Sequence, residues 1–309
     1  MATMRLPLVS GVDGSQTSLR AVDWAVDEAA LHGLPLRVVY ASEEERRRDA
    51  APALGLGRRS EQALADNIVD TAAERARRRH PDVDITAEVL PGDAVIALLR
   101  EGQNAGALIV GERGHGGVTG LLLGSVSLAV AASHPCPVIV VRGDKAGIES
   151  THGRILTGVK EAERGSAAVR FAFREAGARD CVLDAVHAWR CPPRNRSDHP
   201  RTADEPHLYC KERAATLIDL AVADSVREHP TVRLHSAAIE GTAAKTLVQR
   251  SAAADLIIIG AHRRRSHLGP HLGRVARALL HQSDCPVAVI PLATRPYETC
   301  PPHSHGSDA

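Results

Sequence analysis

The sequence ALIVGERGHGGVTGLLLGS, residues 107–125, returns 149 positions later as LIIIGAHRRRSHLGPHLGR, residues 256–274. Each copy begins with a short apolar run, continues into a loop, and reaches a glycine followed by a polar residue. The first loop holds six glycines, whereas the second holds three glycines and four arginines. A recurrence at this distance indicates one structural unit written twice, with a loop that differs between the copies.

Three other segments of the chain recur in the same order. They are LVSGVD at 8–13 with LTGVK at 156–160, VVYA at 38–41 with AVHA at 185–188, and PGDA at 91–94 with EGTA at 240–243. The first two pairs are 147 positions apart, and the third is 149 apart, as are Cys136 and Cys285. The two extra residues predict an insertion between the second strand and the second helix of the second copy.

Each copy alternates short apolar strands with amphipathic helices. In the first copy we expect strands at 6–12, 36–41, 84–90, 107–111 and 136–142, and helices at 18–33, 60–79, 94–102 and 125–133. Such alternation forms a parallel sheet covered on both faces, and right-handed crossovers make it doubly wound. The predicted fold class is therefore α/β. It comprises two tandem doubly wound domains of the Rossmann-like, adenine nucleotide alpha hydrolase-like type, each with a five-stranded parallel sheet.

The boundaries of the two domains follow from the repeat. The segment GDKAGIESTHG is polar and glycine-bearing, which is typical of a linker. We expect a first domain at 1–143, a linker at 144–153, a second domain at 154–293 and a disordered tail at 294–309. Pairing the two halves would cover the apolar edge strands CPVIVVR and CPVAVIP. We expect this intramolecular pair, and a homodimer stays open as an addition.

Composition excludes several classes of protein. The formal net charge is +1 and only seven residues are aromatic, which argues against nucleic-acid binding. The start, MATMRLPLVSG, has no basic region followed by an apolar one, and no run approaches the ~20 apolar residues of a membrane span. We therefore expect a cytoplasmic protein that does not contact membranes. Six cysteines in 309 residues are too few for a disulfide scaffold.

The glycine loop has the chemistry of a phosphate site. In a doubly wound sheet, ligands bind beyond the carboxyl ends of the strands, where the strand order reverses. Glycines let several backbone N–H groups point at one anion, and Gly124-Ser125 opens a helix whose N-terminus favours an anion. Asp13, in the loop after the first strand, supplies an acceptor suited to an amino group, a ribose hydroxyl or a metal.

The spacing G-x2-G-x9-G-[S/T] from Gly111 to Ser125, with VSGVDGS and CPVIVV, resembles the universal stress protein family in its tandem, actinobacterial form. The resemblance covers both repeats and implies that the first domain binds ATP, with or without Mg²⁺. It implies base and ribose contacts at Gly11, Asp13 and Val39, and phosphate contacts at Gly111, Arg113, Gly114, Gly124, Ser125 and Val126. His115 and Gly116 lie in the same loop, where His115 could contact a γ-phosphate.

The second copy differs from the first at three of the positions expected to contact the nucleotide. Lys160 stands in place of Asp13, Arg263 in place of Gly114, and Arg274 in place of Ser125. Two interpretations stay open. Either the second site has degenerated, or its four arginines bind another anion, such as a polyphosphate or an acidic patch of a partner. Those arginines are Arg263, Arg264, Arg265 and Arg274.

One departure from the family pattern lies in the first copy. Gly106 stands where the family usually has an acidic residue before the fourth strand, and the second copy keeps that residue as Asp255. We expect this difference to alter a turn between helix and strand more than the pocket.

The insertion in the second copy holds residue types that bind zinc. They are His187, Cys191, His199, His207 and Cys210. Their spacing does not match a standard zinc motif, and the prolines among them indicate a loop. We therefore expect no metal site.

A catalytic set is not evident in the sequence. The chain has no G-x4-G-K-[S/T] motif, and its opening SGVDGS lacks the second glycine and the adjacent Asp-Ser of the ATP pyrophosphatase loop. We expect an ATP-binding stress-response or dormancy regulator that acts through nucleotide-dependent conformation and an unidentified protein partner, and not an enzyme. Two alternatives stay open. One is a slow ATPase or nucleotidyl transferase that uses His115 or Asp13, and the other is an interaction module with two vestigial sites.

Overall fold

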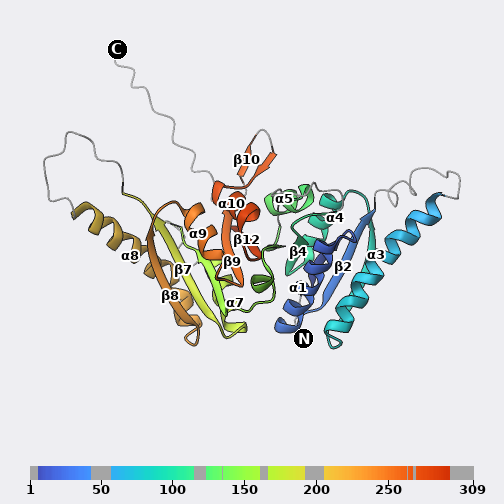
Figure 1. The fold of residues 1–309 in the computed structure, drawn as a ribbon, viewed down its shortest axis with the longest axis horizontal. Helices are drawn as coiled ribbons and strands as arrows, with labels where there is room; N and C mark the ends of the chain where they lie inside the picture. The colour runs from blue at the N-terminus through green and yellow to red at the C-terminus, as the bar shows by residue number, and fades with distance from the viewer. Residues whose placement is uncertain are drawn as a thin grey trace, which may run out of the picture.

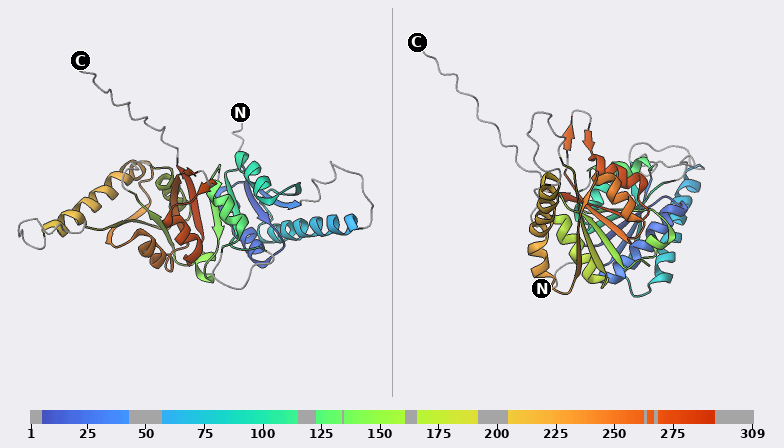
Figure 2. Two further views of the ribbon diagram at one scale, coloured as in Figure 1. Left: turned by 90° about the horizontal axis from the view of Figure 1, so that it is seen from above. Right: turned by 60° about the vertical axis from the view of Figure 1, so that its left-hand side comes forward.

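The chain folds around one ten-stranded sheet with helices on both faces, as the computed structural model in Figures 1 and 2 shows. The structure describes residues 6–42, 57–114, 123–133, 135–160, 166–191, 205–262, 264–266 and 269–292. The predicted α/β class and the tandem arrangement are confirmed. The predicted tail at 294–309 lies outside the described residues.

The first half of the chain supplies one side of the sheet. Its elements are β1 (Leu8–Val12), α1 (Gln16–His32), β2 (Leu36–Ser42), α3 (Gly57–Arg79), β3 (Ile85–Pro91), α4 (Ala94–Glu101), a 3₁₀ turn (Gly102–Asn104), β4 (Ala107–Gly111), α5 (Ser125–Ser133) and β5 (Val138–Val141). The parallel strands stand in the order β3-β2-β1-β4-β5, so the order reverses between β1 and β4. This reversal opens a crevice at the carboxyl ends of those two strands.

The second half repeats this order. Its elements are β6 (Arg154–Gly158), α7 (Ala167–Ala178), β7 (Val182–Trp189), α8 (Glu205–Glu228), β8 (Arg233–Glu240), α9 (Ala243–Ser251), β9 (Leu256–His262), α10 (Arg274–Gln282) and β12 (Val287–Leu292). The parallel strands stand in the order β12-β9-β6-β7-β8. The long helices α3 and α8 lie at the two outer ends of the molecule (Figure 1).

Local sequence explains where several helices begin and end. Ser15 caps α1 by accepting a hydrogen bond from the N–H of Ser18, and Gly33 ends that helix in the left-handed conformation at φ +60°. Asp93 caps α4 by accepting from the N–H groups of Val95 and Ile96. Ser15 and Asp93 thus fix where α1 and α4 begin, and Gly33 fixes where α1 ends.

Two small elements were not predicted from the sequence. A one-turn helix, α6 (Lys145–Ile148), occupies part of the expected linker, and Asp144 caps it. A short antiparallel hairpin, β10 (Arg264–Ser266) with β11 (Gly269–His271), stands in the rewritten loop of the second copy. Neither segment is long enough to show a hydrophobic period, which is why pattern reasoning missed both.

The two halves meet through their edge strands. β5 and β12 pair in the antiparallel sense, with Val140 opposite Val287 and Ile139 opposite Ala288. Each strand therefore covers the edge that the other would expose, as expected for the two CPV segments. The result is one continuous sheet in place of two separate ones.

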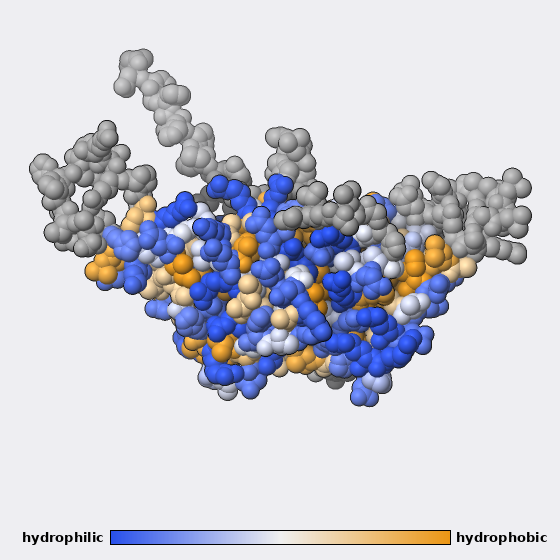
Figure 3. Space-filling model, in the orientation of Figure 1, coloured by the Kyte–Doolittle hydropathy of each residue, from blue (hydrophilic) through white to orange (hydrophobic). Residues whose placement is uncertain are grey.

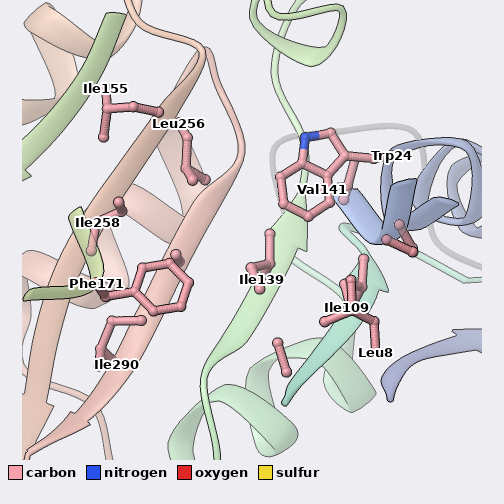
Figure 4. Close-up of a cluster of buried hydrophobic side chains, with 14 of the residues drawn as sticks. Leu8, Trp24, Ile109, Ile139, Val141, Ile155, Phe171, Leu256, Ile258 and Ile290 are labelled. Carbon is pink, nitrogen blue, oxygen red and sulfur yellow. The ribbon is translucent and has the colours of Figure 1, made fainter. Parts of the chain in front are cut away.

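The hydrophobic core also runs across this joint. Ile139 of β5 lies between the Ile109 side of the first domain and Phe171 and Ile290 of the second (Figure 4). One core layer lies under α1, α3, α7 and α8, and the other lies under α4, α5, α9 and α10. The outer surface is predominantly hydrophilic, with apolar residues scattered over it (Figure 3).

Gly106 and its counterpart Asp255 differ in the hydrogen bonds that they make at the turn before the fourth strand. The carboxylate of Asp255 accepts hydrogen bonds from the N–H groups of His152 and Arg154, at 2.8 and 3.0 Å. In the first copy, Pro7 occupies the place of Arg154 and has no N–H to offer. The backbone bond itself is kept, since Gly106 N–H donates to the Pro7 carbonyl at 2.8 Å. An acidic side chain at position 106 would therefore have no N–H from residue 7 to accept, unlike Asp255, which accepts from Arg154.

A buried ionic cluster links α1 to α7 across the two domains. Glu175 and Arg179 follow Glu28 and His32 by 147 positions each, the offset of the repeat (175 − 28 and 179 − 32). His32 Nε2 lies 3.1 Å from Glu175 Oε2 and 3.3 Å from Glu28 Oε1. Arg179 forms ion pairs with both carboxylates. Each carboxylate thus has a basic partner on its own helix and one from the other domain, and Glu175 has a second on its own helix in Arg174, at 3.5 Å.

Burial and pairing shift the protonation of this cluster. Hydrogen bonds to Glu175 and then Glu28 raise the pKa of His32 to about 9. Burial opposes ionisation of Glu175, but His32 and Arg179 outweigh it and lower the pKa of that carboxyl to about 2. Burial and the neighbouring Glu175 raise the pKa of Glu28. At neutral pH the cluster therefore holds a charged imidazolium.

We predict that this imidazolium makes stability depend on pH in the alkaline range. The folded-state pKa of His32 is raised, so its contribution is full below about pH 6.5 and is lost as the pH rises through 9. The unfolding free energy of the wild type should fall relative to His32→Gln by on the order of 2–3 kcal/mol over that window. Urea titrations at a series of pH values measure this difference.

His80→Gln is the matched control for this prediction. His80 pairs with Asp27 at 2.9 Å on the surface, and its side chain is 38% exposed. This substitution should leave the pH dependence unchanged. Parallel stability curves for the wild type and His32→Gln would contradict the prediction.

Candidate functional site

A cavity of about 370 Å³ opens at the carboxyl ends of β1 and β4, where the strand order reverses. Its glycine and polar lining residues are Gly11, Asp13, Ser18, Gly111, Arg113, Gly114, Gly124, Ser125 and Ser127. Its apolar lining residues are Val12, Val39, Ala41, Leu90, Ala94, Ala97, Leu98, Val110 and Val126. The cavity combines the mostly apolar wall and few polar groups that small-molecule sites share.

The carbonyl groups of the glycine loop are bonded within the protein. Ser127 Oγ donates to the Gly111 carbonyl at 2.6 Å, and Gly124 N–H donates to the Glu112 carbonyl at 2.8 Å. The hydroxyl of Thr17, in the first turn of α1, donates to the Arg113 carbonyl. Three successive carbonyl oxygens are thereby engaged, which lowers the negative charge that the loop would present to an anion.

The N-terminus of α5 borders the same cavity. The first hydrogen bond of this helix runs from Leu128 N–H to the Gly124 carbonyl. The N–H groups before Leu128, those of Ser125, Val126 and Ser127, therefore have no acceptor within the helix. Since these three residues line the cavity, the positive end of the helix dipole faces it.

Asp13 and Gly114 are in direct contact across the cavity. A Cβ placed on Gly114 would lie 2.3 Å from Asp13 Oδ2, so only glycine fits beside this carboxylate without moving it. The other oxygen, Oδ1, accepts hydrogen bonds from the N–H and Oγ of Ser15, at 3.0 and 2.6 Å. Asp13 is therefore held in place, with Oδ2 toward the glycine loop.

Arg113 brings a buried donor to the cavity. Its Nε atom is buried and has no hydrogen-bond partner among the residues that the structure describes. The guanidinium lies 4.0 Å from the carboxylate of Glu112, beyond hydrogen-bonding distance. A buried donor without an acceptor is costly, and an anion in the cavity would satisfy it.

The second domain supports this loop from outside. Arg142, directly after β5, donates to the carbonyls of Leu279, Ser283 and His281 at the end of α10, at 3.1, 2.5 and 3.0 Å. Its Nε also lies 3.6 Å from the Glu112 carboxylate. One arginine thus connects the start of the glycine loop to the C-terminus of a helix in the other domain.

The structure gathers nine of the eleven residues predicted for the site around one cavity. They are Gly11, Asp13, Val39, Gly111, Arg113, Gly114, Gly124, Ser125 and Val126. The other two, His115 and Gly116, lie outside the described residues. Sequence reasoning missed the apolar wall from β3 and α4, such as Leu90 and Leu98, because these residues read as ordinary core. It also missed Ser127, although its hydroxyl fixes the Gly111 carbonyl.

The insertion residues do not form one cluster in the described part of the chain. His187 Nδ1 contacts the Val159 carbonyl at 2.9 Å, His207 pairs with Glu240, and His199 is not described. The described group with metal-binding side chains close together is Glu28, His32 and Glu175. Arg179 already occupies both of those carboxylates, so the group is accounted for as an ionic cluster.

Comparison with known proteins identifies the family. The sequence profile described as the Universal stress protein family matches residues 4–142 and again residues 151–291. The chain belongs to the universal stress protein family. Both repeats are therefore universal stress protein domains.

The chain aligns with relatives over nearly their whole length. Universal stress protein Rv1996 of Mycobacterium tuberculosis is 29% identical over 301 residues, which cover 92% of this chain and 94% of the relative. Universal stress protein Rv2005c of the same organism is 30% identical over 295 residues, covering 91% and 96%. A solved universal stress protein from Archaeoglobus fulgidus has the same fold, with a TM-score of 0.65 at 17% identity, covering 92% and 98%. None of the helices in the described part of the chain is long and apolar enough to cross a membrane.

The second universal stress protein domain keeps the scaffold of the first but not its polar groups. Lys160 and Arg274 are exposed, and the side chain of Arg263 lies outside the described residues. Lys160 and Arg263 replace the two residues that contact each other in the first domain, Asp13 and Gly114. The Asp–Gly contact has therefore been lost at both of its positions.

We predict that Arg142→Met destabilises the protein by about 2–3 kcal/mol, the usual contribution of hydrogen bonds to a buried charged group. The substitution removes three hydrogen bonds to carbonyl groups at the end of α10. Denaturant unfolding measures the loss. Arg277→Met, at an exposed position of the same helix, is the control and should cost under about 0.5 kcal/mol. Equal effects of the two substitutions would show that Arg142 does not support the joint.

We also predict that the two copies differ in their tolerance of alanine at the glycine that ends the fourth strand. A Cβ on Gly111 would lie 2.6 Å from the backbone carbonyl oxygen of Thr17, which cannot move without shifting α1. A Cβ on Gly260 would meet the side-chain end of Leu292 at 2.6 Å, and a side chain can rotate. Thermal unfolding should show Gly111→Ala to be the more costly change, by about 1–3 kcal/mol. A larger loss for Gly260→Ala would refute this ranking.

Proposed function

We propose that the first domain binds ATP in the cavity between β1 and β4, with the phosphates against the glycine loop and the N-terminus of α5. One observation carries the proposal. The carbonyls of Gly111, Glu112 and Arg113 are engaged elsewhere, while the first N–H groups of α5, which have no acceptor within the helix, and the buried Nε of Arg113 border the same cavity. This arrangement favours an anion over a neutral ligand. Membership of the family, whose loop pattern runs from Gly111 to Ser125, supports the same assignment.

The remainder of the cavity suits a nucleoside. Val39, Ala41 and Leu90 offer apolar contacts for a base, and Asp13 offers a carboxylate oxygen for a ribose hydroxyl or a base amino group. Asp13 is also the one carboxylate among the described lining residues. A single carboxylate fits a Mg²⁺ ion held mainly by phosphates and water, which the nucleotide would bring with it.

We propose binding and not catalysis as the role of this site. The described lining residues of the cavity include one carboxylate, that of Asp13, and no histidine, which are the usual general bases. Hydrolysis would accordingly be slow or absent. Bound ATP would bias the loop between Gly111 and Ser125 and so the surface offered to a protein partner in the cytoplasm.

We predict that purified protein carries about one ATP per chain, and that Gly114→Arg abolishes binding. This substitution copies Arg263 of the second domain and places a large side chain where Asp13 Oδ2 now lies. Nucleotide released by denaturation is quantified by chromatography and mass spectrometry, and calorimetric titration gives the affinity. A loss of about 2.7 kcal/mol or more, a hundredfold, is expected for Gly114→Arg.

Lys160→Ala is the matched control at the second site and should leave the ATP affinity unchanged. Titration with AMP tests whether the glycine loop contacts the β- and γ-phosphates. If it does, the protein should bind AMP more weakly than ATP. Two ATP per chain would mean that the second site also binds. If neither the released-nucleotide assay nor the calorimetric titration detects ATP, the proposal is overturned. That result would favour a protein-interaction module without a nucleotide.

A further inference from the structure

The last turn of α10 contacts the glycine loop at a second point, besides the contact through Arg142. The N–H of Leu123, which directly precedes Gly124, donates to Nδ1 of His281 at 3.5 Å. A neutral imidazole that carries its proton on Nε2 can accept a hydrogen bond at Nδ1. The backbone carbonyl of His281 accepts from Arg142 at 3.0 Å. His281 therefore bonds to the end of the loop through its ring and to Arg142 through its backbone.

These contacts reach the start of the loop as well as its end. Arg142 Nε lies 3.6 Å from the carboxylate of Glu112, the first residue after β4. The carbonyl of Glu112 accepts from the N–H of Gly124 at 2.8 Å, so the two ends of the loop are also bonded to each other. The side chain of Leu123 packs against the core layer under α5 and α10. We call Glu112, Arg142 and His281 the loop clamp.

The second domain offers an internal comparison, because its rewritten loop leaves an equivalent strand. Gly111 lies opposite Val141 in the first domain, and Gly260 lies opposite Ile290 in the second. Both members of the second pair follow those of the first by 149 positions (260 − 111 and 290 − 141). Residues that are 149 positions apart therefore occupy equivalent places beside the two loops.

The residues of the loop clamp have no polar counterpart beside the second loop. At the offset of 149 positions, each corresponds to a residue whose side chain can neither donate nor accept a hydrogen bond. The pairs are Glu112 with Ala261, Arg142 with Pro291, and His281 with Ala132. The chain thus has the clamp residues beside the loop that keeps its glycines, and apolar residues beside the loop that has lost most of them. Contacts that served only to join the domains would have no reason to follow the state of the loop.

We propose that the end of α10 positions the glycine loop for phosphate binding, with His281 as the positioning residue, so that the second domain sets the ATP affinity of the first. This inference rests on the proposed ATP site and adds a means of regulating it. The N–H groups that face the cavity begin at Ser125, two residues after Leu123 (125 − 123). A loop that is already held at Leu123 loses less freedom when phosphates bind, which raises the affinity.

Linkage makes this effect reciprocal. Contacts between the domains that raise the ATP affinity are themselves strengthened when ATP is bound. A protein that binds the second domain and displaces the end of α10 would lower the ATP affinity without entering the cavity. The second domain therefore has a regulatory role that requires no ligand of its own.

The test compares the ATP and adenosine affinities of the full-length wild type and His281 variants by calorimetric titration. His281→Ala copies Ala132 and His281→Leu keeps the volume, and both remove the acceptor. His281→Asn restores it, because the asparagine Oδ1 is attached to Cγ, as Nδ1 is. At 3.5 Å the hydrogen bond is long, so we expect His281→Ala and His281→Leu to lower the ATP affinity by about three- to tenfold. His281→Asn should stay within about twofold of the wild type.

Adenosine separates positioning of the loop from general damage to the site. Its affinity should be unchanged in all three variants, because the residues proposed to contact base and ribose, Val39, Leu90 and Asp13, lie on other elements. Gln282→Ala, at the exposed neighbouring position, is the matched control and should leave both affinities and the urea midpoint unchanged. Hydrogen exchange gives a readout without nucleotide. The peptide that contains Leu123 should exchange faster in His281→Ala and His281→Leu than in His281→Asn.

The outcomes distinguish this inference from the proposed function. A wild type that binds no ATP would overturn the proposed function and this inference with it. A wild type that binds ATP, together with an unchanged ATP affinity in His281→Ala and His281→Leu, would overturn this inference alone. So would an equal loss in His281→Asn, or an equal loss of adenosine affinity, since either result would indicate a structural role. Circular dichroism checks that each variant folds, and whichever of His281→Ala and His281→Leu is folded decides the test.

Discussion

The antiparallel pairing of β5 with β12 determines how the rest of the molecule is arranged. Because hydrogen bonds fix the register of these strands, ten strands become one sheet and one core layer runs through both domains. The same register brings α1 and α7 together on one face, where Glu28 meets Arg179. On the other face it places the end of α10 against Arg142, and so against the start of the glycine loop. The second domain is therefore part of the structural support of the first site.

Between the two copies, residues that contact each other have been replaced in pairs. Arg37 of β2 pairs with Glu101 at the end of α4, at 2.7 Å. At the same places in the second copy, Asp184 of β7 pairs with Arg250 of α9 at 2.6 Å, so the positions are kept and the charges are reversed. Both pairs belong to larger clusters, since Arg37 also contacts Glu88 and Asp184 also contacts Arg154 and His235. Asp13 and Gly114 lie side by side in the first domain, and both have been replaced in the second, by Lys160 and Arg263.

Local patterns were sufficient to predict the strands, most helices and the polar half of the cavity, because each depends on short-range periodicity or on glycine and cap chemistry. The strand ALIVG and the helix that opens at Gly124-Ser125 are examples. The apolar wall could not be predicted, since Leu90 and Leu98 follow the same pattern as any buried residue. Nor could the partners of Arg142, which lie about 140 residues further along the chain and meet it only through the joint. Sequence therefore indicates which residues can bind an anion, and tertiary contacts decide how firmly the loop that carries them is held.

The glycines that both copies retain have a structural cause that is independent of any ligand. A Cβ on Gly11 would lie 3.0 Å from Leu98, and a Cβ on Gly158 would lie 2.9 Å from Leu247, the corresponding leucine of α9. Each glycine therefore leaves room for a leucine of the helix that packs against the first strand of its domain. A retained glycine at this position is not evidence of a working site. The informative positions are those where packing leaves the choice open, such as the pair Asp13 and Gly114. The second domain has changed there while its strands, helices and core have stayed the same.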